Sequence, residues 1–203
     1  PPAVAAAGYA PAVRVGWSGS SLLARVSTVC FLLVIALGLR TVADSGAISP
    51  AAGALAGLGY AVILMLVGWA QYSRRGELAP VFAVCGAVLL CSIVVETYAH
   101  FGSLPGPAAF LTLGGTALFM TVLGERYRTL LPGTIGVLGV LLSGLALAVP
   151  HPSFAPLAAL FLVTSAVGAM VSRRLKGDWV GWSAFALSAL VLTVWAVRIR
   201  VSI

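Results

Sequence analysis

Long apolar runs alternate with short polar connections along almost the whole chain. Each run is close to the ~20 residues that an α-helix needs to cross the ~30 Å hydrocarbon core of a bilayer. The pattern therefore predicts an all-α, polytopic membrane protein whose transmembrane domain covers residues 21–203. Seven transmembrane helices are expected, at residues 22–42, 51–71, 80–100, 107–123, 132–149, 154–171 and 179–197.

Prolines stand at or just before the start of several apolar runs. Proline lacks a backbone N–H, and the first-turn N–H groups of a helix have no partner within the helix, so proline fits there. We expect these prolines to mark helix starts rather than kinks: Pro50, Pro80, Pro107, Pro132 and Pro156.

The first 20 residues differ from the rest of the chain. They are rich in Pro, Ala and Gly, and they show no positively charged segment followed by an apolar one. Such a composition is typical of a flexible segment. We interpret residues 1–20 as a flexible N-terminal tail of a longer or processed product.

The polar connections recur in two kinds. One kind is closed by a proline, at Pro50, Pro105 and Pro156, with spacings of 55 and 51 residues; the other carries arginines. This recurrence predicts tandem helical hairpins, three complete ones followed by a lone seventh helix. Short loops alone would also make connections alternate in this way, so both interpretations stay open.

Composition agrees with a membrane setting. The chain is 61% hydrophobic and only 8% charged, whereas soluble domains carry about 25% charged residues. Most of these apolar side chains could not be buried in a soluble globule of this length, so the expected partner of the surface is the lipid bilayer.

The net charge is +7, and its distribution predicts an orientation. If the N-terminus is cytoplasmic, nine of the twelve Lys and Arg fall on the cytoplasmic side, which favours an N-in topology in a bacterial cytoplasmic (inner) membrane. No aromatic platform or basic face accompanies this charge, so no nucleic-acid partner is expected.

Small residues predict where helices approach closely. Gly53 and Gly57 have the GxxxG spacing, and Gly59 extends this face. Comparable faces are expected in the next helices, at Gly114 with Gly115 and at Gly136 with Gly139 and Ser143.

Several segments resemble the DUF2339 family of predicted bacterial integral membrane proteins, whose function is uncharacterised. The similar segments are Ala24-Arg25-Val26, Ala43-Asp44-Ser45-Gly46 through Pro50, Gly68-Trp69 with Arg74-Arg75, and Tyr98 through Pro105 followed by Ala108-Ala109-Phe110-Leu111. The resemblance covers about residues 22–150, and this chain would be a short or partial relative. It implies a membrane fold and no reaction.

Polar residues gather near one end of the third predicted helix. Glu96 lies about one turn from that end, where a carboxylate needs a partner, water or a proton. Arg40 lies at a similar depth in the first helix, so we expect an Arg40–Glu96 pair. The expected neighbours of the pair are Asp44, Tyr98 and His100.

Basic residues at the predicted cytoplasmic ends are candidates for contact with anionic lipid headgroups. Ordinary topology-setting charge is the alternative interpretation. The candidates are Arg126, Arg128, Arg173, Arg174 and Lys176.

Catalytic and cofactor patterns are not found. The sequence has no GxSxG, no HExxH and no phosphate-binding glycine loop, so we predict no catalytic, cofactor-binding or metal-binding residues. His100 and His151 are the two histidines, and axial ligation of a haem by both is the alternative. Cys30, Cys85 and Cys91 lie in apolar runs and are interpreted as small hydrophobic side chains.

These features together favour a non-catalytic structural or accessory subunit that binds other membrane protein subunits. The alternative is a small-solute or lipid transporter component that uses the Arg40/Glu96 cluster.

Overall fold

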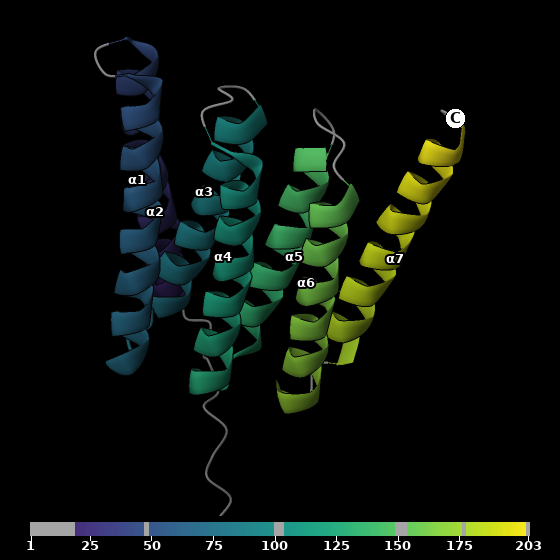
Figure 1. The fold of residues 1–203 in the computed structure, drawn as a ribbon. Helices are drawn as coiled ribbons and strands as arrows, with labels where there is room; N and C mark the ends of the chain where they lie inside the picture. The colour runs from purple at the N-terminus through teal and green to yellow at the C-terminus, as the bar shows by residue number, and fades with distance from the viewer. Residues whose placement is uncertain (1–18, 47–48, 100–103, 149–153, 176–177, 202–203) are drawn as a thin grey trace, which may run out of the picture.

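The computed structural model describes residues 19–46, 49–99, 104–148, 154–175 and 178–201. These residues form seven α-helices and no strand (Figure 1). The predicted all-α class is therefore confirmed. The helices are α1 (Gly19–Asp44), α2 (Pro50–Ser73), α3 (Ala79–Ala99), α4 (Gly106–Tyr127), α5 (Leu130–Ala148), α6 (Phe154–Leu175) and α7 (Asp178–Val201).

Six of these helices are long and apolar enough to cross a membrane, and α7 contains a shorter apolar stretch at Gly181–Thr193. The chain is thus a multi-pass membrane protein. The largest differences from the predicted bounds are four residues each, at the ends of α4, α6 and α7, which were expected at residues 123, 171 and 197 and lie at Tyr127, Leu175 and Val201. In all three helices the apolar run stops earlier than the helix because the last turn carries charged residues.

The helix starts follow the prolines. Ser49 caps α2, because its hydroxyl accepts a hydrogen bond from the Ala52 N–H at 3.3 Å, and Pro50 occupies the first helical position. The prolines at 80, 107, 132 and 156 all lie within the first three residues of their helices. Their predicted role as helix starts is confirmed.

The connections divide the bundle into two ends. We call the end at which α2, α4 and α6 finish the basic end, because Arg74, Arg126 and Arg174 lie there, and the other end the proline end. The closest helix pairs are joined across the basic end: α2 with α3, α4 with α5, and α6 with α7. Each of these hairpins begins near one of the three recurring prolines.

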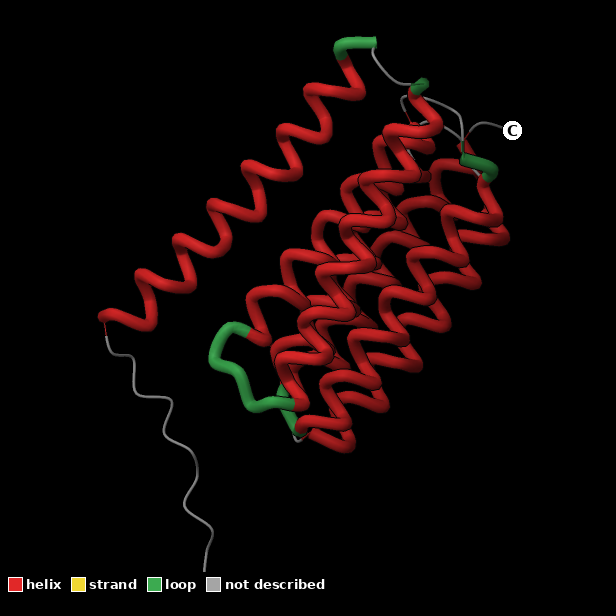
Figure 2. Tube along the Cα trace, turned by 90° about the vertical axis from the view of Figure 1, so that its left-hand side faces the viewer, coloured by secondary structure: helices red, strands yellow, loops and turns green. Residues whose placement is uncertain are grey.

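Hairpins are present, but the lone helix is the first one and not the seventh. α1 packs mainly on α2 and only slightly on α3, whereas α6 and α7 form a close pair. Figure 2 shows α1 at the edge of the bundle. The sequence prediction paired helices across the proline-closed loops, but the tighter turns and closer helix contacts lie across the basic end.

Two turns at the basic end have the same backbone motif. Arg75 and Arg128 adopt the left-handed conformation, with φ of 55° and 52°. The Gly76 N–H donates to the Gln71 carbonyl at 2.8 Å, and the Thr129 N–H donates to the Gly124 carbonyl at 2.9 Å. These are the i to i−5 bonds of the Schellman motif, which ends a helix and reverses the chain within few residues.

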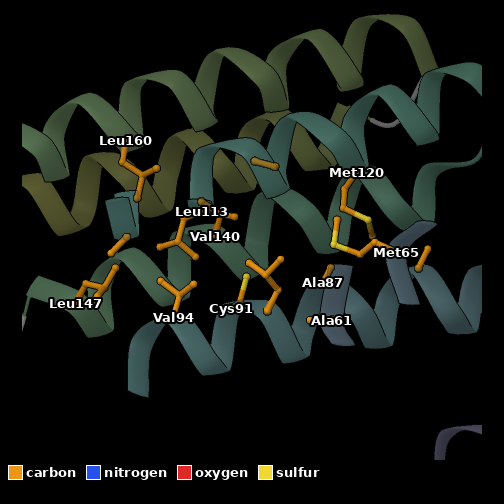
Figure 3. Close-up of a cluster of buried hydrophobic side chains, with 14 of the residues drawn as sticks. Ala61, Met65, Ala87, Cys91, Val94, Leu113, Met120, Val140, Leu147 and Leu160 are labelled. Carbon is orange, nitrogen blue, oxygen red and sulfur yellow. The ribbon is translucent and has the colours of Figure 1, made fainter. Parts of the chain in front are cut away.

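The core lies among α2 to α6. Figure 3 shows the buried side chains of Cys91 and Val94 from α3 meeting Leu113 from α4, Val140 from α5 and Leu160 from α6. A second buried cluster joins α5, α6 and α7 around Phe161, which is fully buried. Because both clusters exclude α1, the first helix contributes little to the core.

Glycines allow the closest contacts between helices, but some of the glycines predicted for this role make no such contact. A Cβ on Gly68 would lie 2.7 Å from the Ala83 backbone N, and one on Gly136 would lie 2.6 Å from the Met120 Cβ. Gly57 also approaches α3, at 3.1 Å from Ile93. A Cβ on Gly59 or Gly115, by contrast, would have no atom within 4 Å, so these two glycines do not make the predicted close contacts between helices of the bundle.

Candidate functional site

The expected pairing of Arg40 and Glu96 is present near the proline end. The Arg40 Nη1 donates to the Glu96 Oε2 at 3.1 Å, and Nη2 contacts the second carboxylate oxygen, Oε1. Arg40 lies four residues before the end of α1 and Glu96 three residues before the end of α3. Both helices finish at the proline end, so they run in the same direction and their C-terminal ends bring the two charges to one depth.

The pair has a two-pronged geometry. A planar guanidinium fork matches the two oxygens of a carboxylate, and such a pair fixes the orientation of both groups. The side chain of Arg40 is 55% exposed and that of Glu96 is 30% exposed. The ion pair therefore lies at the surface of the bundle and ties the peripheral helix α1 to α3.

Of the three residues expected beside the pair, Tyr98 has a described side chain. The side chain of Tyr98 leaves α3 on nearly the opposite side from that of Glu96, because two residues correspond to a rotation of about 200° around the helix. Its ring lies against the start of α4, 3.6 Å from where a Cβ on Gly106 would be, and packs on the main core. Asp44 is the last residue of α1, but its side chain is not described, and His100 lies outside the described residues.

A second contact holds α1 and had no signal in the sequence. The Tyr60 hydroxyl of α2 donates to the Leu32 carbonyl of α1 at 3.2 Å. Leu32 is also the one buried residue among residues 22–42 of α1. Thus α1 is attached along a narrow stripe, by one hydrogen bond near its middle and one ion pair near its end.

The basic end holds most of the predicted headgroup contacts. The Arg174 Nη1 of α6 lies 3.6 Å from the Glu125 Oε2 of α4. Arg126, Arg128 and Arg173 are exposed, whereas Lys176 lies outside the described residues. The structure therefore brings together the charged ends of α4 and α6, a proximity that the sequence did not predict.

Aromatic side chains cover the neighbouring part of this end. Tyr72 of α2 and Tyr127 of α4 stack with ring centroids 5.1 Å apart. Deeper in the bundle, Trp69 of α2 packs against Phe119 of α4 at 5.4 Å. These contacts join the first hairpin, α2–α3, to the second, α4–α5.

Buried polar side chains in the described residues are all Ser or Thr. Most of them bond to their own helix: the hydroxyls of Thr121, Ser143 and Thr164 donate to the carbonyls four residues earlier at 2.7–2.8 Å. Between helices, the Ser165 hydroxyl donates to that of Ser188 at 2.8 Å and joins α6 to α7. These Ser and Thr hydroxyls thus find acceptors within the protein, whereas the buried hydroxyls of Tyr72 and Thr129 at the basic end have no hydrogen-bond partner among the described residues.

No protein-family model, curated protein or solved structure matches this chain. The resemblance to the DUF2339 family therefore stays a prediction.

Chemically, the arrangement is suited to holding helices together and to contacting anions. The Arg40–Glu96 pair neutralises two charges that would be costly alone in a span. The arginines at the basic end present guanidinium donors to the surroundings. In the part of the chain that the structure describes, the Asp, Glu, Lys and Arg residues lie within about two turns of helix ends.

Proposed function

We propose that this protein is a non-catalytic structural or accessory subunit of a larger membrane assembly, and that α1 is the helix on which a partner subunit packs. The observation that carries this proposal is the peripheral position of α1. All but one of its described span residues are exposed or only partly buried, although α1 is the most apolar of the six span candidates.

The exposed side of α1 has the composition of a helix-packing face. Ala24, Ser27 and Gly38 are exposed on it, and Gly38 has no atom within 4 Å. Small residues let a second transmembrane helix approach closely, and such faces drive helix association in membranes. Large apolar residues, Phe31 and Val34, lie between them and would add packing area.

The hydrogen bonding of the buried Ser and Thr side chains in the spans supports the same function. Transport pathways generally place polar or ionisable groups near the middle of the membrane. Here the described buried hydroxyls mostly bond to their own helices, and close glycine contacts hold the hairpins together. Such an interior fits a rigid scaffold.

We further propose that the chain resides in a bacterial cytoplasmic membrane with the basic end facing the cytoplasm, as the arginine distribution favours. We also propose that the chain is a short or partial relative of the DUF2339 family. It agrees with a membrane role and adds no reaction.

The proposal is tested by site-specific photocrosslinking in native membranes. A photoreactive residue replaces Phe31 on α1, and the matched control replaces Leu162 on α6, which is exposed to a similar degree, 67% against 64%. We expect a discrete crosslinked species of fixed mass from position 31 and only diffuse lipid adducts from position 162. The absence of a discrete species at 31, or identical species from both positions, would contradict the docking role.

One observation favours the alternative of a small-solute or lipid transporter component: the Arg40–Glu96 pair is partly exposed and connects the bundle to its least embedded helix. Opening this contact would uncover charge beside α3. Purified protein in liposomes distinguishes the two functions. Solute or lipid flux that is lost in Glu96→Gln would support transport, and the accessory role predicts no flux above protein-free liposomes.

A further inference from the structure

The basic ends of α4 and α6 form a charged surface that the assembly role does not use. These two helices pack against each other and both finish at the basic end. The Arg174–Glu125 contact holds their ends together, and Arg126 and Arg173 flank it as exposed side chains. Three arginines and one glutamate thus meet at this point, with a net charge of +2 from the four side chains.

Apolar side chains lead directly to these arginines on both helices. On α4, exposed Leu118 and Val122 precede Arg126 at intervals of four residues, which places all three on one face. On α6, exposed Val163 and Met170 lead to Arg174. Each guanidinium therefore ends an apolar stripe that faces outward from the bundle, so a molecule contacting both parts must be amphipathic.

The guanidinium of Arg174 is available for a second partner. Its 3.6 Å separation from the Glu125 carboxylate exceeds the ~2.7–2.9 Å of a charge-assisted hydrogen bond. The Arg174 side chain is also 64% exposed, whereas that of Glu125 is 19% exposed. An arginine has five N–H donors, and a distant carboxylate leaves most of them for another anion.

Tryptophans mark the level of this surface relative to the membrane. Trp179 and Trp182, at the start of α7, are both exposed. Gly181 lies between them, and a Cβ on this glycine would be 3.0 Å from the Ser172 Cβ of α6. Tryptophan prefers the headgroup region of a bilayer, so the neighbouring arginines lie at the depth of lipid phosphates.

We propose that Arg126 and Arg174, assisted by Arg173, bind the phosphate of an anionic phospholipid whose acyl chains lie along the exposed faces of α4 and α6. Guanidinium forks match phosphate oxygens, and the apolar stripes match the acyl chains. The same phosphate chemistry occurs in soluble phosphate esters, but these have no part that would contact Leu118, Val122 or Met170.

The test is native mass spectrometry of the purified full chain with added phosphatidylglycerol or phosphatidylcholine of identical acyl chains. We expect at least fivefold more bound phosphatidylglycerol than phosphatidylcholine. The variant Arg126→Gln/Arg174→Gln removes this preference. The matched control Arg74→Gln/Arg75→Gln removes two arginines from the α2–α3 turn and leaves binding within twofold of the unchanged protein.

A second variant covers the case in which loss of Arg174 disturbs folding. Arg126→Gln/Arg173→Gln keeps the Arg174–Glu125 contact, and we expect it to lower phosphatidylglycerol binding at least threefold. Equal losses in this variant and the Arg74/Arg75 control would overturn the proposal, because they indicate unspecific charge attraction. So would equal binding of both lipids, or displacement of the lipid by millimolar inorganic phosphate, which would identify a site for soluble phosphate.

Discussion

Arg40 and Glu96 illustrate how a single ion pair works at the edge of a membrane bundle. An unpaired charge in a span is costly, but a pair close to a helix end keeps access to water and headgroups. Each oxygen of Glu96 has a nitrogen partner on Arg40. Because both side chains are partly exposed, solvent screening reduces the strength of the pair to that of a surface salt bridge.

We predict that Glu96→Gln lowers the free energy of unfolding by about 0.2–1 kcal/mol, the range for exposed ion pairs. Unfolding of the purified protein in a detergent series measures this change. Glu77→Gln, in the connection between α2 and α3, is the control and is expected to have little effect. A double-mutant cycle with Arg40→Gln isolates the pair; strictly additive single effects would show that the two side chains do not interact.

Arg75 and Arg128 show a second residue-scale feature, a side chain in a backbone conformation that favours glycine. The left-handed conformation costs a residue with a Cβ about 1 kcal/mol. Both arginines occupy the same position of a Schellman motif, 53 residues apart. The agreement in local structure between the two turns supports a repeated hairpin unit.

Arg75→Gly is expected to raise the free energy of unfolding by up to about 1 kcal/mol, because it removes this conformational cost. The neighbouring Arg74 has φ of −91° and carries no such cost. Arg74→Gly is the control, and chain entropy makes it neutral or destabilising. Thermal unfolding of the two variants side by side measures the difference, and equal shifts would be inconsistent with a strained turn at position 75.

At the scale of elements, close contacts between helices decide how they pair. Apolar runs and prolines predict where each helix begins and ends, because both depend on local sequence. Which neighbour a helix contacts depends on where two surfaces fit, and local sequence does not show this. The predicted hairpins were therefore shifted by one helix, with the seventh helix alone in place of the first. The GxxxG spacing near the start of α2 suggested the contact face, yet the closest approaches in α2–α3 involve Gly68 and Gly86.

The α2–α3 contact gives a matched pair of substitutions in one helix. Gly68→Ala would place a methyl group 2.7 Å from the Ala83 N, so the helices must separate. We expect a loss of about 1–3 kcal/mol of unfolding free energy. Gly59→Ala meets open space and is expected to be neutral or stabilising by up to about 1 kcal/mol. Similar effects of both substitutions in unfolding experiments would argue against this packing.

At the scale of the whole molecule, the sequence predicted the fold class far better than the contacts at its surface. The apolar runs predicted seven helices, and six of them are long and apolar enough to cross a membrane. The Arg40–Glu96 contact was predictable because few charges share that depth. The Glu125–Arg174 contact was not predictable, because it depends on α4 and α6 being neighbours. The Tyr60–Leu32 hydrogen bond was not predictable either, because every residue has a carbonyl acceptor.

The whole molecule is a hairpin bundle with a peripheral first helix, and our central proposal is that a partner subunit covers this helix. Native mass spectrometry of the protein extracted from its own membranes in lipid nanodiscs tests this claim most directly. We predict one species that contains this chain and at least one different membrane protein in a fixed ratio. A chain recovered alone, or only with copies of itself, under extraction that preserves known membrane assemblies would contradict the account.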